Sequence, residues 1–190
     1  MASTYPTAID AFTNPTATSL LTSPSHAQQH SDINDAMEAV QTKLAIGNTV
    51  IGTYTAYTPT FPSGLTVGDG TFSSAYATVN KLTHYYGTFI FGSTSAITAA
   101  NVAISLPTTP DSTITGMSFP GFTSSVVNFY DTSGSLSLYG FASINSATQA
   151  RIYVTLASGT YVQLTTLSST VPFTWATGDR MQWNFTYRTA

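Results

Sequence analysis

The residues of this chain best suited to acid–base or metal chemistry are its three histidines, His26, His30 and His84. His26 and His30 are four residues apart, which places both on one face of a helix, either as two metal ligands or as a polar layer that sets helix register. We favour the polar layer and expect no metal. His84 would be the base for any serine nucleophile, but its place before Tyr85 in a predicted strand indicates a surface or core histidine instead.

Carboxylates are the second group that might do chemistry, and the sequence has only eight of them. Two acids at a suitable separation would make a glycosidase pair, which would place the chain among cell-wall polysaccharide depolymerases. Turn formation explains four of the acids better, because each stands within two residues of Gly, Pro or Ser. These four are Asp69, Asp111, Asp131 and Asp179. We therefore expect a protein without catalytic residues and without a cofactor, and not an enzyme.

The charge content excludes several classes of partner. Charged residues make up 7% of the 190 residues and the net charge is −3, with the basic residues scattered singly. Nucleic-acid binding draws on clustered Lys and Arg, so we expect no nucleic-acid partner. The apolar runs are too short to span a bilayer and the N-terminus lacks the pattern of a secretory signal, so we expect no membrane insertion. Cysteine is absent, which excludes disulfides and thiolate metal sites.

Residues 25–46 are predicted to form the one helix of the chain. Ser25 and Gln28 have the spacing of a capping box, and Gly47-Asn48 suits the helix end. Apolar and histidine side chains recur three and four residues apart and form a seam that another helix should cover. The seam consists of His26, His30, Ile33, Met37, Val40 and Leu44. The same helix in another copy is the simplest cover, which predicts an oligomer; packing across a sheet of its own subunit is the alternative.

Residues 1–24 are predicted to be an extended arm, because Pro6, Pro15 and Pro24 disfavour helix. Large apolar residues are spaced along this segment, as in arms that lie across another protein's surface. These anchoring residues are Tyr5, Ile9, Phe12, Leu20 and Leu21. The alternative is a floppy terminus that takes no ordered structure on any partner.

Residues 47–70 are predicted to be a connector and residues 71–190 a β domain. Short alternating segments are separated by turns such as Gly68-Asp69-Gly70, Ser158-Gly159 and Gly178-Asp179. Predicted strands are Phe72–Leu82, Thr83–Phe91, Asn101–Leu106, Val126–Asp131, Ser135–Phe141, Ala150–Leu156, Tyr161–Leu167 and Arg180–Tyr187. This spacing favours a mainly β fold with an antiparallel β-sandwich or jelly roll.

Aromatic residues make up 13% of the chain, which invites a carbohydrate-binding interpretation. Tyr and Trp present an apolar face to a sugar ring and a polar edge to its hydroxyl groups. Tyr139, Tyr161 and Trp175 are the candidates, because they fall near predicted strand ends or loops. A place in the core or in a subunit interface is the ordinary alternative for each of them.

Both the N-terminal and the C-terminal half of the sequence resemble bacteriophage virion proteins. The run YPTAIDAFTNPTATSLLTSPSHAQQHSDINDAMEAVQTKLA is similar to the opening of fibre-like and minor tail proteins of actinobacterial phages. The later segments GDGTF, YYGTF and PFTWATGD resemble β domains of fibre tips or head fibres. The long repeat-rich shaft that usually follows the helix is absent after Leu44.

The resemblance implies a homotrimeric structural protein on the virion surface. Its arm would anchor to capsid or tail proteins, its helix would form a coiled-coil-like stalk, and its β domain would be a knob. Two roles stay open: a head fibre or capsid decoration protein, which the short chain favours slightly, and a tail receptor-binding protein that attaches to a host glycan, which the aromatic residues favour. A depolymerase is the third and least favoured class.

Overall fold

The computed structural model describes residues 25–44, 53–114 and 124–190. The chain divides into two compact units, Met1–Thr53 and Tyr54–Ala190. The predicted anchoring residues Tyr5, Ile9, Phe12, Leu20 and Leu21 lie outside the described residues.

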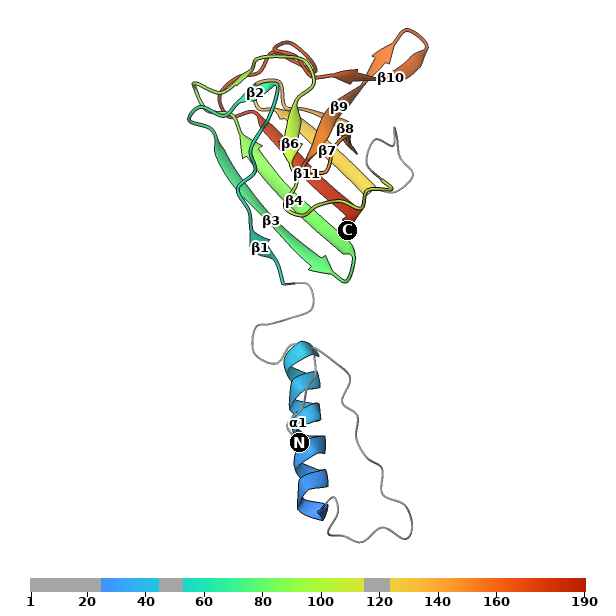
Figure 1. Cartoon of the computed structure of the whole chain (residues 1–190). Coiled ribbons are helices and arrows are strands. Elements are labelled where there is room, and N and C mark those ends of the chain that lie inside the picture. The colour runs from blue at the N-terminus through green and yellow to red at the C-terminus, as the bar shows by residue number, and fades with distance from the viewer. Residues whose placement is uncertain (1–24, 45–52, 115–123) are drawn as a thin grey trace. The chain divides into compact units, whose positions relative to one another are not determined.

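The first unit contains α1 (His26–Leu44), which confirms the predicted helix to within two residues at its end (Figure 1). Ser25 caps it, because its Oγ accepts a hydrogen bond from the backbone N–H of Gln28 at 3.1 Å. Along the predicted seam, Ile33 is 56% and Met37 54% exposed, and Val40 is half-buried. Leu44 is the last helical residue, and its side chain lies outside the described part.

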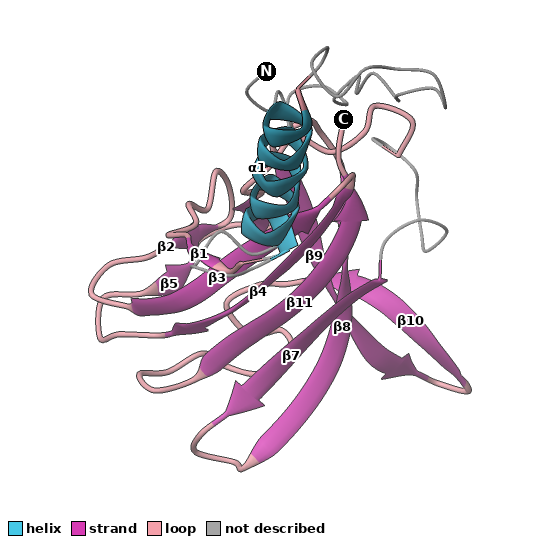
Figure 2. Ribbon diagram, turned by 90° about the horizontal axis from the view of Figure 1, so that it is seen from below, coloured by secondary structure: helices cyan, strands magenta, loops and turns pink. Residues whose placement is uncertain are grey.

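The second unit is a mainly β domain built on one large antiparallel sheet (Figures 1 and 2). The strand order is β1 (Thr55–Ala56), β3 (Thr71–Val79), β4 (Leu82–Ile90), β11 (Arg180–Arg188), β7 (Ser124–Asp131), β8 (Leu136–Ile144), β9 (Gln149–Ser158) and β10 (Tyr161–Thr166). The short strand β6 (Ala103–Ser105) pairs with β9, and β2 (Leu65–Thr66) pairs with β5 (Ala96–Ile97) in a second, two-stranded sheet. The predicted antiparallel β class is therefore confirmed.

The last strand of the chain occupies the middle of the large sheet. β11 pairs with β4 on one side and with β7 on the other, so it joins the first and second halves of the domain. Its sequence alternates as predicted, with Met181, Trp183, Phe185 and Tyr187 all buried on one face. The core that they form also includes Tyr85 and Phe89 of β4, Val127 and Phe129 of β7, and Ile152 and Val154 of β9.

Two predicted boundaries differ from the structure. The break between the first two long strands lies at Asn80-Lys81, earlier than expected, because Val79 pairs with Leu82 across a two-residue turn. Asn80 has φ 53° there, a left-handed conformation that Asn tolerates better than most residues. The β domain also begins before Thr71: Thr55 and Ala56 pair with β3, and the compact unit starts at Tyr54. Much of the segment predicted as a connector is therefore part of the domain.

Candidate functional site

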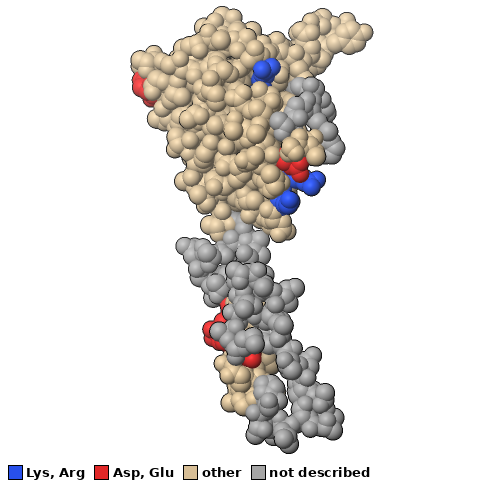
Figure 3. Space-filling view, in the orientation of Figure 1, with Lys and Arg blue, Asp and Glu red and all other residues tan. Residues whose placement is uncertain are grey.

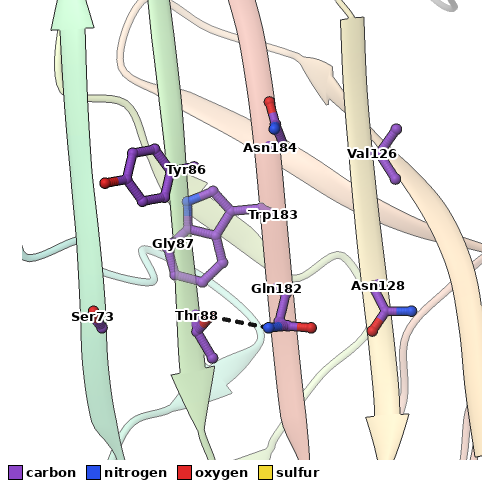
Figure 4. A pocket seen from close by; sticks show the side chains of 9 residues that line it. All are labelled: Ser73, Tyr86, Gly87, Thr88, Val126, Asn128, Gln182, Trp183 and Asn184. Atoms are coloured by element: carbon purple, nitrogen blue, oxygen red, sulfur yellow. Dashed lines mark hydrogen bonds between the residues drawn. The ribbon is translucent and has the colours of Figure 1, made fainter. Parts of the chain in front are cut away.

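The central strands β3, β4, β11 and β7 carry a hollow on the face of the sheet that points away from the core. Strand alternation fixes this face, because each outward residue stands between two buried ones, as Gln182 stands between Met181 and Trp183. The hollow has a volume of about 360 Å³. It is lined by Ser73, Tyr86, Gly87, Thr88, Val126, Asn128, Gln182, Trp183 and Asn184 (Figure 4).

Gly87 lies behind the hollow and lets Trp183 pack closely against β4 on the core side of the sheet. A Cβ atom at this position would lie 2.3 Å from the Cβ of Ser74 and 2.5 Å from Cζ2 of Trp183. The indole of Trp183 therefore lies directly against the backbone of β4, in space that any other residue would fill. This close approach explains why a glycine interrupts an otherwise aromatic strand.

Two of the three carboxamides at the hollow are held by hydrogen bonds within the sheet. Nε2 of Gln182 donates to Oγ1 of Thr88 at 3.3 Å, across the β11–β4 pair (Figure 4). Nδ2 of Asn128 donates to the backbone carbonyl of Leu138 on β8, over a longer 3.4 Å. Each carboxamide has two N–H donors and an oxygen that accepts twice, so each keeps hydrogen-bonding capacity for a ligand.

His84 positions the third carboxamide. Its Nε2 lies 2.8 Å from Oδ1 of Asn184, and its Nδ1 lies 2.6 Å from the hydroxyl of Tyr54. In the neutral imidazole that suits this arrangement, Nε2–H donates to Asn184 and Nδ1 accepts from Tyr54. The Nδ2 group of Asn184 is then the part of that side chain left for other partners. His84 is thus tied into the sheet surface, in line with the structural interpretation of this histidine.

An aromatic pair lies beside this network. The rings of Tyr54 and Tyr86 meet edge to face with centroids 5.1 Å apart, and Tyr54 also contacts His84. Tyr86 is exposed, so its ring is accessible from the hollow. The sequence pattern does not predict this cluster, because Tyr54 reaches it from residues 47–70, the predicted connector. The alternation of two amides with two aromatic residues in Gln182-Trp183-Asn184-Phe185 is the one sequence signal that points to this cluster.

Trp175 is half-buried, packs against the core and does not line the hollow. Its ring stacks on Phe91 with centroids 4.5 Å apart and packs against Phe173 at 4.7 Å. Its Nε1–H points at the backbone carbonyls of Ser168 and Val171, at 3.0 and 3.3 Å. The polar edge of the indole is therefore engaged within the domain, and packing accounts for the residue.

Tyr139 and Tyr161, the other two glycan candidates, are exposed but are not among the residues that line the hollow. Tyr139 is 59% exposed on β8, on the same face of the sheet as Asn128, its partner on β7. Tyr161 is 79% exposed at the start of β10, in the hairpin that projects from the domain in Figure 1. The structure thus brings none of the three candidates to the lining of the hollow.

Asp111 and Asp131 bond their own turns as predicted, whereas the carboxylates of Asp69 and Asp179 also join segments distant in the chain. Backbone and side-chain hydrogen bonds from Thr94 and Ser93 hold the pKa of Asp69 well below its usual range. Hydrogen bonds from Thr113 do the same for Asp111, and those from Ser133 and Gly134 for Asp131. Asp111 also forms an ion pair with Arg188 at 3.0 Å.

Asp179 is buried and links two loops. Its carboxylate accepts hydrogen bonds from the backbone N–H of Ala176 at 2.7 Å and of Thr132 at 3.0 Å. The Thr132 bond ties the entry of β11 to the turn after β7. This acid therefore has a structural role that needs no substrate.

The two helix histidines lie together, with their Nε2 atoms 2.7 Å apart and ring centroids at 4.4 Å. One ring must donate and the other accept, so at least one is neutral in this geometry. Within residues 25–44, 53–114 and 124–190, no group of three or more His, Cys, Asp or Glu side chains is arranged to hold a metal ion.

Charged side chains are sparse on the face of the molecule shown in Figure 3. None of the helices in the described segments is both long and apolar enough to cross a membrane. Comparisons with protein-family models, with curated proteins and with solved structures found no match.

Proposed function

We propose that this chain is a non-enzymatic structural protein of a bacteriophage virion that assembles as a homotrimer. In this proposal α1 forms a short coiled-coil stalk, residues 1–24 attach to capsid or tail proteins, and the β unit is a jelly-roll-like knob on the particle surface. The resemblance of residues 5–45 to phage fibre-like proteins supports the virion role and the choice of a trimer.

The exposed seam of α1 is the observation that carries the proposal. Ile33 and Met37 lie four residues apart on one face of the helix, and more than half of each side chain is accessible to water. An isolated helix of 19 residues is marginally stable, and most helices gain their stability by burying an apolar face. Sister copies of α1 would bury this face and present several knobs at once, so that weak contacts add through effective concentration.

Light scattering on the full chain tests the assembly. We expect a particle of three times the 20.1 kDa chain mass. Ile33→Asp should convert it to single subunits, because a charge in the seam cannot be buried without a partner. Glu38→Gln, on an exposed polar position of the same helix, is the matched control and should leave the trimer intact. A wild-type chain that stays a monomer at high concentration would refute the proposal.

A tail receptor-binding protein is the second candidate, and the hollow on the β unit favours it over a purely structural knob. Antibody labelling of intact particles separates the two: label on heads supports a head fibre or decoration protein, and label on tails supports receptor binding.

A further inference from the structure

We propose that the hollow formed by β3, β4, β11 and β7 binds a short, uncharged carbohydrate of one or two sugar rings. This gives the receptor-binding candidate a site and a ligand class, and it rests on that candidate only for its biological role. Binding itself is a property of the β unit and can be measured whether or not the chain forms a trimer.

The lining of the hollow is polar but uncharged, which favours uncharged polar ligands. None of its nine residues is Lys, Arg, His, Asp or Glu. An anionic ligand such as a phosphate or a uronic acid would lose water without gaining a charged partner, which costs more than neutral hydrogen bonds return. A purely apolar ligand is disfavoured as well, because it would strip water from Asn128, Gln182 and Asn184 without replacing their hydrogen bonds.

The three carboxamides match the chemistry of sugar hydroxyl groups. A hydroxyl group both donates and accepts, and so does a carboxamide. Asn184 and Gln182 project from alternate positions of β11, and Asn128 lies directly across from Gln182 on β7. The bonds to His84, Thr88 and Leu138 hold these side chains in place before a ligand arrives. Such preorganisation reduces the entropy lost on binding.

Tyr86 supplies the apolar contact that a sugar ring needs. Its exposed ring borders the hollow and is supported from the side by Tyr54 at 5.1 Å. An aromatic ring offers its face to the C–H groups of a pyranose while its hydroxyl remains in water. The volume of about 360 Å³ lies at the small end of the roughly 300–1,000 Å³ typical of ligand sites, which suits a ligand of one or two rings.

Saturation-transfer NMR on the full chain tests this site. The probes are the methyl glycosides of glucose, galactose, mannose, rhamnose and arabinose and their homodisaccharides, with methyl glucuronide as the charged comparison. We expect transfer to at least one neutral probe, a Kd in the millimolar range, and no transfer to the glucuronide. No transfer to any neutral probe at about 50 mM, or equal transfer to the glucuronide, overturns the proposal.

Paired variants locate the binding. Gln182→Ala and Asn184→Ala should each weaken binding about tenfold, the effect of one lost hydrogen bond in a desolvated site. Gln163→Ala removes the same side chain from an exposed position on β10 and should leave the Kd unchanged. Equal effects of Gln182→Ala and Gln163→Ala, or none from either hollow variant, would place the sugar elsewhere and overturn the assignment.

The monomeric Ile33→Asp variant separates this proposal from the previous one. Binding that persists with the wild-type Kd in single subunits supports the hollow, even if the wild-type chain proves not to be a trimer. Binding that disappears in the folded Ile33→Asp variant overturns the assignment to one β unit.

Discussion

Replacing Trp175 by alanine decides between packing and ligand binding for this residue. The structure places the indole against Phe91 and Phe173, with its N–H bonded to backbone carbonyls of the loop before β11. If packing is its role, the Trp175→Ala variant is less stable than the wild-type protein. If Trp175 instead contacts a glycan, the variant keeps its stability and loses only binding.

The size of the effect follows from what the side chain touches. Truncating a large aromatic residue in a core costs about 3–5 kcal/mol, and the half-buried Trp175 belongs at the low end of that range. The lost N–H bond is worth about 1 kcal/mol, reduced where water reaches the carbonyl groups. We expect a loss of about 3 kcal/mol for Trp175→Ala. Trp175→Phe keeps a ring and loses only the N–H group and part of the contact area, and should cost about 1 kcal/mol.

Urea unfolding followed by tryptophan fluorescence measures the free energy of unfolding of both variants. Trp183, the one other tryptophan, remains in each as a buried probe. The control is Tyr161→Ala, which removes a highly exposed aromatic side chain from β10 and should change the free energy of unfolding by less than about 0.5 kcal/mol. A loss below about 1 kcal/mol for Trp175→Ala would refute the packing argument.

Three further predictions concern the scaffold of the β unit. Asp179→Ala leaves two backbone N–H groups without their acceptor and should lower the free energy of unfolding by about 2–4 kcal/mol in urea titrations, with Asp179→Asn less harmful because it keeps one acceptor. Gly87→Ala drives a methyl group into Trp183 and should cost about 1–3 kcal/mol, seen as a lower thermal midpoint; an unchanged midpoint would show that β4 relaxes freely. Asp69 and Asp131 have lowered pKa values in the folded state, so their stabilising effect is complete above the unfolded pKa of about 4 and is lost as the pH falls through the folded pKa. Thermal melts should therefore be flat from pH 7 to 5 and fall below about pH 4, with a shallower fall for Asp69→Asn; a midpoint that already falls between pH 7 and 5 would contradict this.

Local patterns identified the elements that depend on neighbours in the sequence. Ser25 and Gln28 marked the start of α1 because a cap involves residues three positions apart. The alternation in β11 located its buried face, because that period is a property of the strand itself. Turn acids such as Asp131 were recognised for the same reason: their partners stand two and three residues away.

Strand boundaries and the candidate site depend on contacts between distant parts of the chain, which a local sequence pattern does not reveal. β3 ends at Val79 because Val79 pairs with Leu82, a choice of register between two strands. Tyr54 belongs to the domain because its ring meets Tyr86 and its hydroxyl meets His84, thirty residues along the chain. Trp175, one of the three aromatic residues chosen from sequence, has loop-like neighbours in the chain, yet its ring packs on Phe91, which is distant in the chain.

The sequence by itself determined the mainly β class, the position of the one predicted helix with its apolar seam, and the poverty of charge, because propensity, periodicity and composition are local properties. Only the tertiary structure decided that β11 lies in the centre of the sheet, between β4 and β7. That placement brings amides from β7 and β11 beside a tyrosine from β4. Hydrogen-bond pairing between strands far apart in the chain creates the hollow, and no single strand carries its pattern.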